Sequence, residues 1–206
     1  ADVVIVNTHL YGMHVAAGGA ILPEHDVVIF DEAHQLEDTL TSTVGVSLAA
    51  SRATTLAAAL RRVIEDERLQ KRLHDEGKAL NDVLAPDVEQ RLALPLPDAV
   101  VDCLTTLRLT AGECLEVLRA VDSAVDSVRQ KMFRAQTLAT RLADDIDAAL
   151  RADTSHVPFV TGTAERAEIV LAPLDVGPAL AEHAWPGHAV VLTSATIPLS
   201  MPQRVG

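Results

Sequence analysis

The feature that most constrains the fold is the apolar run Val27–Phe30 (VVIF), which leads directly into the polar stretch 31–34 (DEAH). A continuous apolar run of this length is typical of a strand that is buried on both faces in a parallel α/β sheet. Such sheets bind ligands at the carboxyl ends of their strands. An acid there can hold Mg²⁺ directly or through water, and a second acid can deprotonate an attacking water. Asp31 and Glu32 occupy these positions, although a solvated acidic turn that caps the next helix is the simpler alternative.

Two further stretches narrow the interpretation, because 3–10 (VVIVNTHL) and 190–196 (VVLTSAT) are also apolar runs that end in polar residues. Together with the DEAH stretch they resemble the DinG and xeroderma-pigmentosum-group-D helicases of superfamily 2. Residues 31–34 resemble the Walker B box (motif II), residues 3–10 the segment before that box, and residues 190–196 motif III. Residues 31–38 and 172–176 also resemble DinG-type sequences.

The resemblance implies an α/β plus all-α fold. Roughly 160 residues separate the box from the last stretch, too many for a simple strand–helix–strand step, and the family fills this gap with a helical insertion, the arch. We expect a partial RecA-like parallel sheet of about three strands from residues 1–50 and 165–206, and a helical bundle or hairpin from 51–164. Strand 190–192 would pair with Val27–Phe30, with strand 2–6 on its other side. Asp31 and Ser194 would then lie close together.

The same resemblance implies roles for five residues. Asp31 would help to hold Mg²⁺ on the β- and γ-phosphates of ATP, and Glu32 would activate the hydrolytic water. His34 would couple the nucleotide site to motif III and to a second motor domain. Ser194 and Thr196 would hydrogen-bond near the box and transmit the nucleotide state. Without the box, residues 193–196 would read as an ordinary strand-end turn, and Asn7 more commonly fixes a turn than performs chemistry.

The sequence contains no Gly-x-x-x-x-Gly-Lys-[Ser/Thr] phosphate loop. By resemblance this loop would precede Ala1, as would the cysteines that hold an iron–sulfur cluster in many members, and the second motor domain would follow Gly206. ATP and Mg²⁺ would be cofactors of the full-length protein, whose partners would be single-stranded or forked DNA and the rest of the helicase. We expect the fragment alone neither to bind ATP tightly nor to unwind DNA, because backbone amides and a lysine normally hold the triphosphate.

Helical periodicity dominates the middle of the chain. Apolar residues form a stripe across 53–84, where Gly77 is a candidate break, and residues 94–97 (LPLP) mark a boundary. From 100 to 149 apolar residues recur every three or four positions, which predicts one very long helix or an antiparallel pair. Gly112 and residues 122–127 are the candidate breaks, and we favour a hairpin or bundle. Residues 157–160 and 167–171 are predicted strands of a hairpin.

The net charge of the chain limits how it could contact nucleic acid. A net charge of −12 and a pI near 5.0 argue against a broad basic footprint. Arg129, Lys131 and Arg134 are the candidate DNA-contacting residues, and the alternative is a solvated helix face balanced by nearby acids. The basic residues of the predicted insertion considered for this role are Arg61, Arg62, Arg68, Lys71, Arg72, Arg129, Lys131, Arg134 and Arg141.

No signal peptide or membrane-spanning run is visible, and we expect a cytoplasmic protein. Cys103 and Cys114 have no zinc or iron–sulfur spacing, which favours reduced thiols. Two other function classes stay open. One is a helical protein-interaction module that binds a partner through the 100–149 seam, and the other is a self-contained metal hydrolase that uses Asp31, Glu32 and His34.

Overall fold

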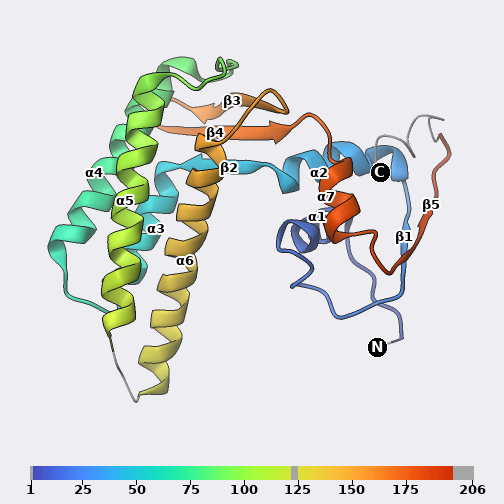
Figure 1. The fold of residues 1–206 in the computed structure, drawn as a ribbon, viewed down its shortest axis with the longest axis horizontal. Helices are drawn as coiled ribbons and strands as arrows, with labels where there is room; N and C mark the ends of the chain where they lie inside the picture. Colours follow the sequence, from blue (N-terminus) through green and yellow to red (C-terminus); the bar gives the residue numbers. More distant parts are fainter. Residues whose placement is uncertain (1, 122–124, 197–206) are drawn as a thin grey trace. The chain divides into compact units, whose positions relative to one another are not determined.

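A computed structural model describes residues 2–121 and 125–196, which form two compact units (Figure 1). The strand-pair unit comprises residues 1–45 and 172–206, and the helical unit comprises 46–171. The elements of the strand-pair unit are α1 (Thr8–Ala16), β1 (Val27–Phe30), the 3₁₀ turn η1 (Ala33–Gln35), α2 (Leu36–Val44), α7 (Gly177–His183) and β5 (Ala189–Leu192).

In the strand-pair unit, β1 and β5 pair in parallel, with Val28 opposite Val190 and Phe30 opposite Leu192. This confirms the predicted pairing of two segments that lie about 160 residues apart in sequence. One face of β1 packs on the helices, so that Val28 and Phe30 share a buried apolar cluster with Tyr11, Leu40 and other helical residues. Burying these side chains removes apolar surface from water, which is what holds the strand pair to α1, α2 and α7.

Two expectations for this sheet are wrong. Residues 2–6 form no strand, and Val3 and Ile5 are 78% and 93% exposed, so the described parallel sheet has two strands and not three. β1 is buried on one face only, because Val27 and Ile29 are 55% and 65% exposed. Successive strand residues point to opposite faces, and no described element covers the second face. β-branched composition alone does not make a strand where no partner strand supplies hydrogen bonds.

The helical unit contains four long helices and a small antiparallel sheet. Its elements are β2 (Val46–Ala49), α3 (Ala50–Leu60), α4 (Glu67–Leu84), η2 (Ala85–Asp87), α5 (Asp98–Ala120), α6 (Asp126–Leu150), β3 (His156–Thr163) and β4 (Arg166–Pro173). The sheet order is β2–β4–β3, with β2 antiparallel to β4. The predicted hairpin near residues 157–171 is therefore confirmed, and a strand from before the helices completes its sheet.

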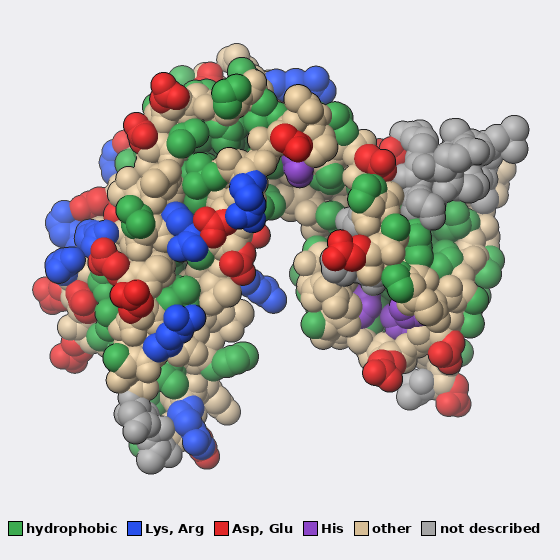
Figure 2. Space-filling model, in the orientation of Figure 1, with side chains coloured by type: hydrophobic (Ala, Val, Ile, Leu, Met, Phe, Trp, Pro, Cys, Tyr) green, Lys and Arg blue, Asp and Glu red, His purple; other side chains and the backbone are tan. Residues whose placement is uncertain are grey.

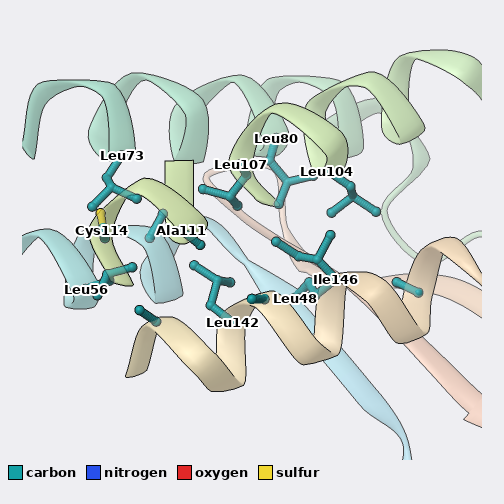
Figure 3. Packing of buried hydrophobic residues seen from close by; sticks show 14 of the residues in the cluster. Leu48, Leu56, Leu73, Leu80, Leu104, Leu107, Ala111, Cys114, Leu142 and Ile146 are labelled. Carbon is teal, nitrogen blue, oxygen red and sulfur yellow. The ribbon is translucent and has the colours of Figure 1, made fainter. Parts of the chain in front are cut away.

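The four helices enclose one apolar core (Figure 3). Leu56 of α3, Leu73 of α4, Leu107 of α5 and Leu142 of α6 are all buried within it, and β2 adds Leu48. The 100–149 seam is thus an antiparallel pair that packs on α3 and α4. Helix α5 ends at Ala120 and α6 begins at Asp126, which agrees with a predicted break in 122–127; residues 122–124 lie outside the described part of the chain.

Neither glycine proposed as a helix break interrupts a helix. The predicted helix over 53–84 is two helices, but the chain turns at residues 61–66, and Gly77 lies inside α4. A Cβ at Gly77 would stand 3.1 Å from the Ala50 carbonyl oxygen and from the Ala53 Cβ. Gly77 is therefore a point of close approach between α3 and α4. Gly112 likewise lies inside α5.

A buried polar network joins α4 to α5. The Thr110 hydroxyl is fully buried, donates to Glu76 Oε1 at 2.8 Å and accepts from Arg72 Nη2 at 2.6 Å. Arg72 also pairs with Glu113 at 2.6 Å. Burial raises the pKa of Glu76 and raises the pKa of the Cys114 thiol to about 12. Both cysteines are free thiols. Among residues 2–121 and 125–196, no helix has the length and apolar character needed to cross a bilayer.

Candidate functional site

The candidate site lies where β1 and β5 end. Beyond the strands the parallel ladder continues for one step: the Thr193 N–H donates to the Phe30 carbonyl at 2.8 Å, and the Ala33 N–H donates to the Thr193 carbonyl at 2.9 Å. Ala33 is 1% exposed. A small side chain therefore fits the point where the chain turns from strand to helix, and both polar strand ends lie at one edge of the sheet.

Asp31 makes the most direct contact between these strand ends. Its Oδ1 accepts hydrogen bonds from the Thr193 hydroxyl at 2.8 Å and from the Glu32 N–H at 3.0 Å. Both bonds use the same oxygen, which leaves Oδ2 for a cation or for water bound to one. The residue is exposed. One carboxylate oxygen is a donor set that fits Mg²⁺, because this ion keeps several waters and takes its other ligands from phosphates.

Glu32 has an unusual backbone. Its φ is +50°, in the left-handed region that residues other than glycine rarely adopt. This conformation begins η1 and separates the Glu32 side chain from that of Asp31. The Glu32 carboxylate is 61% exposed, and its Oε2 lies 3.3 Å from His34 Nδ1. It is therefore open to solvent while it stays within reach of the imidazole.

His34 connects the acid pair to the later strand. Its Nδ1 lies 3.0 Å from the Ser194 hydroxyl oxygen, across 160 positions of sequence. If Nδ1 carries a proton it donates to Ser194 or to Glu32, and if it does not, the Ser194 hydroxyl donates to it. The Thr196 N–H donates to Ser194 Oγ at 3.4 Å. The structure thus brings Asp31, Glu32, His34 and Ser194 together, and Thr196 joins them through its backbone N–H.

Sequence reasoning assigned no individual role to Thr193, whose hydroxyl contacts Asp31 directly. The available signal was its place immediately after the apolar strand, opposite an acid in the same position on the partner strand.

A second group that the sequence analysis missed is the cluster of His14, His25 and His188 around Tyr11. The ring centroids of His25 and His188 lie 4.5 Å apart, and those of His14 and His25 lie 5.6 Å apart.

The histidine cluster is structural in character. His14 is 4% exposed, and its Nδ1 accepts the backbone N–H groups of Ile21 and Leu22 at 3.2 and 2.9 Å. It therefore fixes the loop between α1 and β1. Burial lowers the pKa of His14, and the neighbouring His25 and His188 lower it further. Figure 2 shows histidine side chains gathered in the strand-pair unit.

The described part of the strand-pair unit carries acidic side chains and no basic Lys or Arg side chains. Its described residues, 2–45 and 172–196, include no Lys or Arg but carry Asp31, Glu32 and several other acids. Figure 2 shows Lys and Arg side chains on the helical unit and none among the coloured residues of this unit. The described residues of this unit therefore offer no Lys or Arg side chain to an anionic ligand at the strand ends.

The basic residues of α6 differ in their partners. Arg129 pairs with Asp126 one turn away, whereas Lys131 and Arg134 have no ion pair with any residue that the structure describes. On α4, Lys71 and Lys78 pair with acids four residues later. The described residues contain no group of three or more His, Cys, Asp or Glu side chains arranged to hold a metal ion.

Comparison with known proteins gives partial matches. The chain is 39% identical over 75 residues to the Mycobacterium tuberculosis protein named ATP-dependent helicase DinG; the match covers 35% of this chain and 11% of that protein. It is 34% identical over 137 residues to the Escherichia coli protein named ATP-dependent DNA helicase YoaA, covering 54% of this chain and 22% of that protein. No family model matches. The chain is thus similar to parts of these helicases, and the matches span 11% and 22% of their lengths.

Proposed function

We propose that this chain is the part of a DinG-like, ATP-dependent DNA helicase that carries motif II, the helical arch and motif III. Residues 1–50 and 165–206 belong to the first motor domain, and 51–164 to the arch. The observation that carries the proposal is the hydrogen bond from the Thr193 hydroxyl to Asp31 across 162 positions of sequence. It joins two short motifs at one edge of a parallel sheet, where α/β proteins bind nucleotides.

In this proposal the two acids have separate tasks. Asp31 offers one carboxylate oxygen to Mg²⁺, while Thr193 and the Glu32 backbone hold the other oxygen in place. Bound Mg²⁺ would neutralise charge on the β- and γ-phosphates. Glu32 takes the proton of the attacking water, because its carboxylate is exposed to solvent and lies 3.3 Å from the imidazole of His34.

His34 and Ser194 provide the coupling between motifs. A shift of the Glu32 carboxylate towards the water weakens its contact with His34 Nδ1, and the imidazole then depends on Ser194. The Ser194 hydroxyl also receives the Thr196 N–H. A change at the acid pair therefore reaches residues 194–196 through three short contacts. These connect ATP hydrolysis to the rest of the helicase.

Further segments of the helicase are required for activity. This sequence holds no phosphate loop, and the described residues of the strand-pair unit lack any Lys or Arg. ATP binding and DNA unwinding therefore depend on a phosphate-loop segment and a second motor domain, and the fragment alone is inactive. The partners of the whole protein are single-stranded or forked DNA, and its place is the cytoplasm.

Replacing Glu32 tests the assignment of the general base. In the whole helicase, Glu32→Gln is expected to lower kcat for ATP hydrolysis by at least about 100-fold with little change in KM, because only proton removal is lost. Asp38→Asn, in the first turn of α2, removes one exposed acid nearby and is expected to leave kcat within about twofold. Equal kcat values for Glu32→Gln and Asp38→Asn would overturn the assignment. ATP turnover by the 206-residue chain alone would contradict its predicted inactivity.

A further inference from the structure

A pocket of about 230 Å³ lies in the helical unit between the end of α3 and the middle of α6. Its polar wall consists of Thr54, Thr55, Arg62 and Arg134, and its apolar floor includes Leu138 and two alanines. Both arginines and both threonines are exposed, so the pocket is open to solvent. Among the described residues no Asp or Glu lines it. The site is therefore locally cationic in a chain whose net charge is −12.

The guanidinium groups of this pocket have no acidic partner among the described residues. Neither Arg62 nor Arg134 has an ion pair or side-chain hydrogen bond with any residue that the structure describes. Nearby on the same two helices, Arg52 and Asp145 neutralise each other at 2.6 Å. Each guanidinium presents up to five N–H donors in a rigid fork that matches the oxygens of a phosphate. Two unpaired forks at one opening predict an anionic ligand, most simply a phosphate group.

An exposed aromatic ring lies beside the pocket in sequence. Phe133 directly precedes Arg134 on α6 and is 71% exposed, while Phe30 is 5% exposed in the other unit. The chain contains only three phenylalanines, so one of them on a solvated helix face is notable. Aromatic rings that lie next to basic residues are the usual means of holding unpaired bases, because every base has a face that can stack.

We propose that the pocket binds a backbone phosphate of single-stranded nucleic acid through Arg62 and Arg134, and that Phe133 stacks on a neighbouring base. The choice of nucleic acid as the ligand rests on the proposed function, whereas the pocket and its cations do not. Single strands fit better than duplexes because only unpaired bases offer a free face to Phe133. An acidic peptide would use the arginines but would gain nothing from the ring.

The test measures binding of the 206-residue chain to a fluorescently labelled oligo(dT) of about 20 nucleotides by anisotropy, at about 50 mM and about 200 mM salt. The double variant Arg62→Ala/Arg134→Ala is expected to bind at least about fivefold more weakly and to lower the salt slope by about 1. The control Arg119→Ala/Arg151→Ala removes the same charge from two exposed positions outside the pocket, one in α5 and one directly after α6, and should stay within about twofold.

Phe133→Ala tests the stacking step. It is expected to weaken oligo(dT) binding about five- to tenfold and to leave binding of an abasic oligomer of equal length unchanged. Leu109→Ala, which truncates another exposed apolar side chain, should change neither. Circular dichroism melts verify that each variant is folded. Absence of binding by the parent chain, equal losses in the two arginine doubles, or tighter binding of poly-glutamate than of oligo(dT) would overturn the proposal. The Glu32→Gln result does not depend on any of these outcomes.

Discussion

Glu32 adopts φ +50° just after the end of β1, although a glycine would adopt that conformation without strain. Such outliers persist where the surrounding structure imposes them, and they gather at functional sites. The left-handed turn is what separates Glu32 from Asp31, so that one acid contacts Thr193 and the other contacts His34. The strain thus supports a working role for the Glu32 carboxylate.

This strain can be measured. Glu32→Gly is expected to raise the free energy of unfolding by up to about 1 kcal/mol, because glycine carries no penalty at positive φ. Glu37→Gly places the same substitution in the first turn of α2 and is expected to lower it by about 0.5–1 kcal/mol. Urea unfolding followed by the fluorescence of Trp185, the only tryptophan of the chain, reports on this unit. Destabilisation by both changes would contradict the strain.

His14 gives the strand-pair unit a pH dependence. Its folded pKa is lowered, mainly by burial, so the unfolded chain binds more protons below the ordinary value of 6.5. Its contribution to stability is therefore complete above pH 6.5 and is lost as pH falls towards 5. The urea midpoint reported by Trp185 should drop between pH 7.5 and pH 5, and His9→Gln, at an exposed histidine of the same helix, should preserve the drop. An unchanged or higher midpoint at pH 5 would contradict this account.

At the residue scale, the acid pair and its partner Ser194 could be predicted from the sequence, because apolar runs that end in polar residues mark strand ends. The hydrogen bond between Thr193 and Asp31 could not be predicted, because it depends on the register of the two strands. The sequence likewise contains no sign of the His14 cluster. The three imidazoles come from separate segments with no spacing pattern, and only the folded chain brings them together.

At the scale of elements, two glycines that both lie inside helices have different surroundings. A Cβ at Gly77 meets the Ala50 carbonyl and the Ala53 Cβ at 3.1 Å, whereas at Gly112 its nearest contact is Arg108 Nη1 at 3.6 Å. Gly77→Ala is expected to lower the free energy of unfolding by about 1–2 kcal/mol through overpacking. Gly112→Ala is expected to raise it by about 0.5–1 kcal/mol through helix propensity. Thermal unfolding monitored by helical circular dichroism compares them, and shifts of the same sign would contradict the packing.

Element boundaries were predictable where packing and local signals agree. The pair α5–α6 follows from an unbroken apolar period over 100–149 with polar residues at its middle. The turn between α3 and α4 was missed because residues 61–65 contain no glycine or proline. Its one local signal is Asp66, whose Oδ1 caps α4 by accepting the Leu69 N–H at 3.0 Å. Residues 2–6 show the reverse case, a strong strand composition without a strand.

At the scale of the whole molecule, the two units differ in their content of basic side chains. All Lys and Arg residues of the described chain lie in 46–171, and the described strand-pair unit has only acids and histidines as charged or titrating groups beside its tyrosine. Most apolar residues of the 100–149 seam are buried in the core that α5 and α6 share with α3 and α4, although Val125 is 57% exposed. The Asp31 site and the basic side chains therefore belong to different units, as the proposed function expects if different units contact ATP and DNA.

The central claim is that β1 and β5 are parallel neighbours that bring Asp31 to residues 193–194. Oxidation of Ile29→Cys/Val191→Cys, with Cys103 and Cys114 replaced by serine, tests it directly. These exposed positions are paired in register, and neighbouring strands lie about 4.8 Å apart, within disulfide range. We expect rapid cross-linking of this pair, read by mass spectrometry, and little for Ile29→Cys/Ala189→Cys, which is two residues out of register. Failure of the first pair, or faster cross-linking of the second, would contradict the account.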